Sequence, residues 1–187
     1  MGIIELILLA VGLSMDACAV AICKGLALRK VNTKQMITVG LWFGGFQGLM
    51  PLFGYLLASL FADFIRSVDH WVAFALLGFI GVNMIREALS KEEEESDPSL
   101  SFKTMLVMAI ATSIDAMAVG ISFAFLDVQI VPAVTLIGVI TFTLSALGVK
   151  LGAAFGCRFK SKAELAGGVI LISLGLKILI EHLFFGG

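Results

Sequence analysis

Charged side chains are scarce in this sequence. Asp, Glu, Lys and Arg make up 14% of its 187 residues and hydrophobic residues 59%, whereas a soluble domain carries about 25% charged residues. The mean hydropathy of +1.05 shows the same imbalance. The sequence therefore predicts an integral membrane protein with the lipid bilayer as its surroundings. The net charge of −1 and the lack of a basic patch with interleaved aromatics exclude nucleic acid as a partner.

Cysteine and histidine, the usual ligands of zinc, are also rare. Cys18, Cys23 and Cys157 form no Cys-x-x-Cys pair and no even set, which argues against structural disulfides and a zinc site. His70 and His182 lie at the ends of apolar stretches. The N-terminus lacks the basic segment and small-residue cleavage site of a signal peptide, so we expect its first apolar stretch to be retained.

Six apolar stretches are long enough to cross a bilayer as helices, which takes about 20 residues. They cover residues 3–28, 36–61, 70–89, 102–126, 130–156 and 163–185. An acidic, proline-containing segment at 90–101 separates the third stretch from the fourth. The sequence thus predicts an all-α membrane protein with six transmembrane helices and one polar linker.

The basic residues near these stretches predict the orientation. Cytoplasmic loops carry an excess of Lys and Arg. One side of the predicted membrane has only Arg66, whereas the other has nine basic residues: Arg29, Lys30, Lys34, Arg86, Lys91, Lys103, Arg158, Lys160 and Lys162. We therefore expect both termini outside and the acidic linker in the cytoplasm.

The two halves of the sequence resemble each other. Ser14-Met15-Asp16-Ala17 in the first stretch corresponds to Ser113-Ile114-Asp115-Ala116 in the fourth, at a shift of 99 residues. Gly40 and Gly81 likewise have counterparts in Gly138 and Gly175. Three helices in each repeat (1–89 and 102–187) place the second repeat upside down relative to the first. Inverted repeats are the architecture of many secondary transporters, with the binding site near the bilayer midplane.

Small residues recur every fourth position in the second and fifth stretches. Glycines at this spacing let helix backbones approach closely; they are Gly40, Gly44 and Gly48, and Gly148, Gly152 and Gly156. Pro51 predicts a kink in the second helix, because proline removes one backbone hydrogen bond.

Asp16 and Asp115 are the candidate ligands of a transported cation. A carboxylate at the centre of a membrane helix costs about 2.5 to 3.5 kcal/mol on insertion scales, so it usually has a function. Two carboxylates balance one divalent cation, and oxygen ligands suit Mg²⁺, Ca²⁺ or Mn²⁺. Ser14 and Ser113 could add hydroxyl ligands, although Ser14 and Asp16 share an ion only if the helix unwinds locally. The structural alternative is that Lys150 or Lys177 neutralises the aspartates and they only join helices.

The whole chain resembles the MntP-type manganese efflux pump family of small six-span bacterial exporters. The resemblance rests on the segments 12–17, 83–87, 111–116 and 177–182. It implies a secondary transporter that exports Mn²⁺ from the bacterial cytoplasm across the inner membrane by alternating access. Mn²⁺ would be its substrate rather than a cofactor, and the protein would not be an enzyme. The chain departs from the family pattern at Gln47, where an acidic residue is expected, and at Asn83, where Arg is expected.

Ionisable and polar residues near the ends of the third and sixth stretches are candidate pathway residues. Asn83 and Glu87 are four residues apart and share a helix face, as do Lys177 and Glu181. Our hypothesis is that Glu87 gathers the cation on the cytoplasmic side, while Lys177 paired with Glu181 guards the outer path. Lysine shifts its pKa readily when buried, which makes proton coupling through Lys177 a further hypothesis.

Other functions remain open at this point. An exporter of an amino acid or another small cationic solute, as in the distantly similar lysine exporters, would also use midplane acidic groups. A membrane thiol electron-transfer protein needs a redox cysteine in each half, but Cys18 and Cys23 correspond to Met117 and Ser122. An intramembrane aspartyl protease needs Gly-x-Gly-Asp, which precedes neither aspartate.

Overall fold

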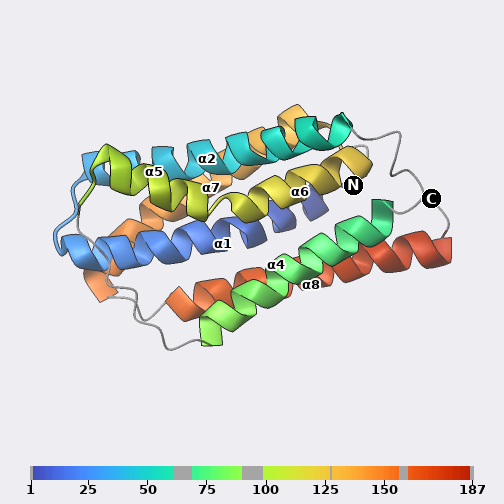
Figure 1. Cartoon of the computed structure of the whole chain (residues 1–187). Coiled ribbons are helices and arrows are strands. Elements are labelled where there is room, and N and C mark those ends of the chain that lie inside the picture. The colour runs from blue at the N-terminus through green and yellow to red at the C-terminus, as the bar shows by residue number, and fades with distance from the viewer. Residues whose placement is uncertain (1, 61–68, 90–98, 127, 156–159, 186–187) are drawn as a thin grey trace.

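Long helices make up nearly all of the structure. The computed structural model describes residues 2–60, 69–89, 99–126, 128–155 and 160–185, with the backbone alone at 69–73, 87–88, 160 and 181–185. Within these ranges the chain forms seven helices and no strand (Figure 1). They are α1 (Ile3–Leu28), α2 (Thr33–Ser59), α4 (Asp69–Leu89), α5 (Phe102–Ala111), α6 (Ile114–Phe125), α7 (Ile130–Phe155) and α8 (Lys160–Phe185).

Several of these helices can cross a membrane. The helices α1, α2 and α7 and residues Ser161–Ile180 of α8 are long and apolar enough, and the bent pair of α5 and α6 would make a fifth span. The described apolar part of α4, Phe74–Arg86, is shorter. The protein is therefore an all-helical, multi-pass membrane protein, and the helix positions agree with the stretches expected from the sequence. The acidic linker expected at 90–101 lies outside the described residues except for 99–101.

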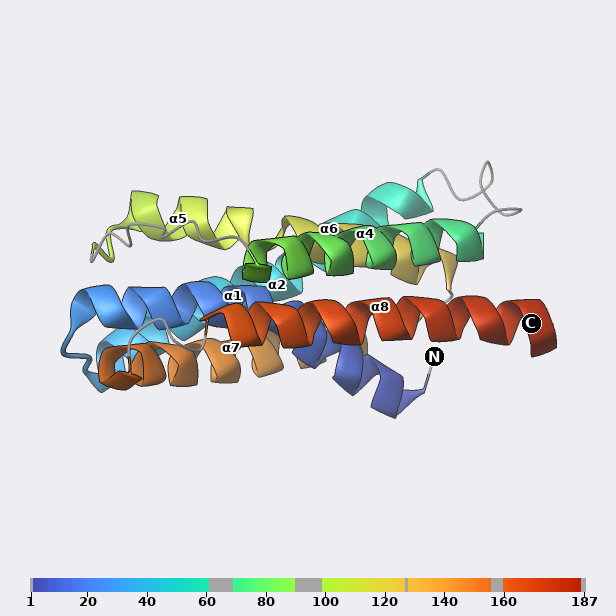
Figure 2. The same ribbon diagram turned by 90° about the horizontal axis from the view of Figure 1, so that it is seen from below.

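Helix α1 occupies the centre of the bundle. It packs along α7 and α8, while α2 packs on α7 and α6, and α4 packs on α8 and α6 (Figures 1 and 2). Of the most apolar stretch of α1, 67% is buried inside the protein, against 22% for α7. Because α7 exposes most of its apolar surface, we assign that surface to lipid and α1 to the protein interior.

A capping box sets the start of α2. The Asn32 side chain accepts a hydrogen bond from the Gln35 N–H, and the Gln35 side chain accepts one from the Asn32 N–H, both at 2.9 Å. This reciprocal pair satisfies two backbone donors at the helix N-terminus. Hydropathy favoured a start at residue 36, but the polar cap starts the helix at Thr33.

The predicted fourth span, 102–126, is broken in the middle. The helix α5 ends at Ala111, α6 begins at Ile114, and their axes differ by 44°. The Thr112 hydroxyl donates to the Met108 carbonyl at 3.0 Å, a contact of the kind that bends helices. The Ser113 N–H bonds to the Ile110 carbonyl, three residues back rather than four. The stretch expected at 102–126 is therefore two helices joined at a break.

Glycines stand where the helix backbones come closest. A Cβ atom at Gly44 would lie 2.7 Å from the Gly138 carbonyl oxygen of α7, and one at Gly152 would overlap the Ile22 carbonyl of α1. The prediction that glycine rows in α2 and α7 allow close packing is confirmed at these positions, whereas Gly156 lies outside the described residues. Helix α2 continues through Pro51, whose carbonyl lies against Gly120 of α6.

Candidate functional site

Asp16 lies on the central helix, in its most buried part. Its side chain is half-buried, between the fully buried Ser14 and Ala17. Helix α1 is continuous from Ile3 to Leu28, so no unwinding occurs at this motif. Residues two apart do not share a face of a regular helix. The condition under which Ser14 and Asp16 could reach one ion is therefore not met in α1.

The Ser14 hydroxyl has two other partners. It donates to the Ala10 carbonyl and shares a hydrogen bond with the Thr141 hydroxyl of α7, both at 2.6 Å. All of these atoms lie in the buried contact between α1 and α7. In this structure Ser14 joins two helices, and its role as a metal ligand remains a prediction.

Asp115 lies in the first turn of α6, immediately after the break. Its side chain is half-buried, and its Oδ1 atom accepts a hydrogen bond from the Ala116 N–H at 2.8 Å. The N-terminus of a helix carries a partial positive charge and several unpaired N–H groups, which stabilise a carboxylate. The break thus places the Asp115 carboxyl group at a helix N-terminus inside a predicted span.

Gln47 of α2 connects the two Ser-x-Asp motifs. Its Nε2 atom donates to the Leu13 carbonyl of α1 at 3.1 Å, and its Oε1 atom accepts from the Ser113 hydroxyl at 2.9 Å. Gln47, Leu13 and Ser113 are all 0% exposed. The sequence singled out Gln47 only as a departure from the family pattern. Its polarity in an apolar stretch, one turn before Pro51, was the available signal.

Two buried charged residues were not assigned a role by the sequence analysis. Lys24 of α1 is 0% exposed, and its Nζ atom lies 3.8 Å from the Met108 sulfur of α5. Glu164, in the first turns of α8, is 3% exposed. Charged residues are rarely buried to this degree unless they are paired. An ionisable residue inside an apolar stretch was the signal in both cases.

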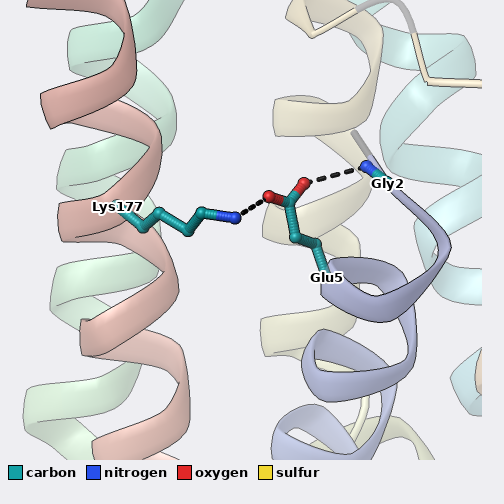
Figure 3. Close-up of polar contacts among 3 residues, drawn as sticks. All are labelled: Gly2, Glu5 and Lys177. Carbon is teal, nitrogen blue, oxygen red and sulfur yellow. Dashed lines mark hydrogen bonds and ion pairs between the residues drawn. The ribbon is translucent and has the colours of Figure 1, made fainter.

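The four predicted pathway residues are distributed over α4 and α8. Asn83 is exposed on α4, whereas the side chains of Glu87 and Glu181 lie outside the described part of the structure. Lys177 forms an ion pair with Glu5 of α1 (Figure 3). The predicted pair of Lys177 with Glu181 stays a prediction, and Glu5 is an ion-pair partner that the sequence analysis missed.

Glu5 makes contacts through both carboxylate oxygens. Oε1 accepts from the Lys177 ammonium of α8, while Oε2 accepts from the Gly2 N–H at 2.9 Å (Figure 3). The Glu5 side chain is 17% exposed and that of Lys177 47%. The ion pair therefore joins the beginning of α1 to α8 at a partly accessible place.

The described residues contain no group of three or more His, Cys, Asp and Glu side chains that could hold a metal ion. The candidate ligands Asp16 and Asp115 are two half-buried carboxylates. Such hard oxygen ligands suit Mg²⁺, Ca²⁺ or Mn²⁺ rather than zinc or copper.

The chain is similar to one known protein family along most of its length. The family described as "Putative manganese efflux pump" matches residues 29–179. The protein of that name in Acetivibrio thermocellus is 58% identical to this chain over 184 residues, which cover 98% of this chain and 93% of the relative. The one in Desulfitobacterium hafniense is also 58% identical, over 187 residues that cover 100% of this chain and 99% of the relative. The relative in Mannheimia succiniciproducens is 54% identical over the full length of both chains. No solved structure matches.

Proposed function

Because the chain belongs to the MntP family of manganese efflux pumps, we propose that it exports Mn²⁺ from the bacterial cytoplasm across the inner membrane. The observation that carries this proposal is the position of Asp16 and Asp115. Both are half-buried on otherwise apolar helices, in equivalent motifs that Gln47 connects. We take them to be the carboxylate ligands of the cation near the bilayer midplane.

The packing of the helices supports an inverted repeat. If the second half repeats the first, α1 corresponds to α5 and α6, α2 to α7, and α4 to α8. The contact of α1 with α7 then corresponds to that of α2 with α6, and the contact of α1 with α8 to that of α4 with α6. The pairs of α2 with α7 and α4 with α8 correspond to themselves. This exchange is what a pseudo-twofold axis requires. We propose three spans in each half, six in all, and an odd number of spans per half would place that axis in the membrane plane, as in transporters with alternating access.

Orientation follows from the positions of the basic residues. The last turn of α1 and the first turns of α2, α5 and α8 lie at the same end of the bundle (Figure 1). Arg29, Lys30, Lys34, Lys103 and Lys162 are all in or next to these turns. We therefore propose that this end faces the cytoplasm and that the beginning of α1 and the end of α8 face outward.

An amino-acid exporter is the second candidate. The N-terminus of α6 inside the bundle is a half-helix end of the kind that binds a substrate carboxylate in other transporters. In this protein Asp115 already places its own carboxylate at that helix end. A second carboxylate there would be repelled, so the site favours a cation that both aspartates can bind.

Uptake by inverted membrane vesicles tests the function. We expect vesicles that contain the protein to accumulate Mn²⁺ when energised, and lysine not to compete. A cysteine at Glu94→Cys, in the acidic linker, should react with an impermeant maleimide in these vesicles and not in intact cells. Vesicles without the protein are the control. Equal Mn²⁺ accumulation in both preparations would contradict the function, and labelling in intact cells would reverse the orientation.

We further propose that Lys177 closes the outer path in this conformation through its ion pair with Glu5. The pair joins α8 to the beginning of α1, at the end of the bundle that we assign to the outside (Figures 1 and 3). Toward the end of the bundle that we assign to the cytoplasm, Gly167 of α8 abuts the Gly12 carbonyl of α1. A fixed crossing at Gly12 and Gly167 with a separable ion pair beyond it permits an outer opening between α1 and α8.

Removing either partner of this pair should slow export. We expect Lys177→Met and Glu5→Gln each to lower the maximal rate of export about five-fold. This factor corresponds to the loss of about 1 kcal/mol of stabilisation of the closed outer path. The charge exchange Glu5→Lys with Lys177→Glu should restore most of the rate. Lys150→Met is the control, because Lys150 is exposed on α7 and can extend toward the membrane surface. Rates over a range of Mn²⁺ concentrations decide, and equal small effects of all variants would contradict a gate.

A further inference from the structure

Gln47 is the residue through which the structure joins the two aspartate motifs. Its amide contacts Leu13, the residue before Ser14, and Ser113, two residues before Asp115. Leu13 lies on α1 and Ser113 at the break before α6, so the two contacts come from both halves of the sequence. A side chain that bonds to both motifs determines how far apart they lie.

The chemistry of the amide suits this bridge. It offers a donor to the Leu13 carbonyl and an acceptor to the Ser113 hydroxyl, and both bonds are fully buried. A buried polar group that loses its partner costs about 1 to 3 kcal/mol, so the bridge resists separation. The amide is also neutral, so it leaves Asp16 and Asp115 as the two charges that balance a divalent cation.

The backbone that carries Gln47 is itself closely held. Before it, Gly44 of α2 lies against the Gly138 carbonyl of α7, so close that a Cβ atom at Gly44 would stand 2.7 Å from that oxygen. After it, the Pro51 carbonyl lies against Gly120 of α6. Neither contact leaves space for α2 to shift toward its neighbours. Gln47 thus lies on a closely held helix, and accurate positioning requires such a rigid support.

We propose that Gln47 is a positioning residue that sets the spacing of Asp16 and Asp115 for the transported cation, without binding the cation itself. This inference rests on the proposed function. Ser113, whose hydroxyl donates to Gln47 Oε1, lies at the break between α5 and α6, so the same bridge also fixes where α6 begins and where Asp115 stands. A misplacement of about 1 Å can cost about 100-fold in a site that depends on geometry.

Three substitutions test the bridge. Gln47→Leu removes both hydrogen bonds at similar volume, and Ser113→Ala removes one of them. We expect Gln47→Leu to raise the apparent KM for Mn²⁺ and to lower the maximal rate. The ratio of maximal rate to apparent KM should fall at least ten-fold, and Ser113→Ala should lower it less. The double variant should be no worse than Gln47→Leu, because both changes remove the same bridge. Ser113→Thr, which keeps the hydroxyl, should retain export.

Matched controls separate positioning from a general loss of stability. Gln129→Leu and Ser173→Ala make the same chemical changes at exposed positions, and they should leave export unchanged. Gln47→Asn keeps an amide but is one methylene too short to reach both partners. It should therefore reduce export as Gln47→Leu does, and it provides the test if the leucine variant folds poorly. The amount of protein in the membrane is measured for every variant.

Several results would overturn the proposal. Export by Gln47→Asn at the wild-type rate and KM would do so, and so would effects of Gln47→Leu and Ser113→Ala that simply multiply in the double variant. If wild-type vesicles move no Mn²⁺, the proposed function fails but the bridge can still be tested. The thermal unfolding of the purified variants should then show the same non-additivity, and additive shifts in Tm would contradict the bridge.

Discussion

Asp16→Asn and Asp115→Asn should each abolish Mn²⁺ export while the protein stays in the membrane. Each change removes one charge from the site and nearly preserves the side-chain volume. Two opposite unit charges 4 Å apart attract by about 4 kcal/mol at an effective dielectric constant of 20, and 1.4 kcal/mol corresponds to a factor of ten. We therefore expect at least a 100-fold loss of Mn²⁺ uptake by inverted vesicles, measured at equal protein content.

The control is Asp97→Asn, the same chemical change in the acidic linker, which should keep export unchanged. Asp115→Asn carries a further expectation, because the Asp115 carboxylate is placed at the N-terminus of α6. The neutral amide can still accept a hydrogen bond at that helix end. We therefore expect Asp115→Asn to abolish export while its Tm stays near that of the wild type. Wild-type rates in either aspartate variant would show that this aspartate is not a ligand of the transported ion.

The second large effect concerns assembly. Gly152→Ala should strongly reduce the amount of folded protein, because a Cβ atom there would overlap the carbonyl carbon and oxygen of Ile22. Backbone atoms cannot move aside as the end of a flexible side chain can. Overpacking costs about 1 to 3 kcal/mol in well-packed cores, and we expect this position at the upper end. Gly25→Ala, which would overlap the Val149 carbonyl, should behave alike.

Gly45→Ala provides the matched control. A Cβ atom at Gly45 meets nothing within 4 Å, although the preceding residue, Gly44, is closely packed against α7. The amount of protein in the membrane and the Tm of detergent-purified material are the measurements. Gly45→Ala should match the wild type or exceed it slightly, since alanine favours helices over glycine by about 1 kcal/mol. Normal levels of Gly152→Ala would mean that α1 and α7 are less closely packed than described.

Sequence and structure agree best where the determinant is local. The length of the apolar stretches placed the helices to within a few residues. In lipid, a helix must hydrogen-bond all of its backbone N–H and C=O groups internally, and its lipid-facing side chains must be hydrophobic. The start of α2 was missed because its cap is polar. Apolar length gave only the outer limits of the stretch 102–126, because both segments that flank the break after Ala111 are apolar. Glycine spacing predicted close packing, but which helix each glycine contacts depended on the arrangement of the bundle.

The sequence by itself determined that this is a helical membrane protein with two equivalent Ser-x-Asp motifs, and it identified the family. Only the tertiary structure decided that Gln47 joins Leu13 to Ser113, which lies 66 residues after Gln47 in the chain. It also decided that Lys177 pairs with Glu5, 172 residues away. Hydropathy and periodicity report on a helix and its nearest surroundings. A polar contact between distant helices depends on how the helices pack, and that is specified by the whole chain rather than by any single stretch.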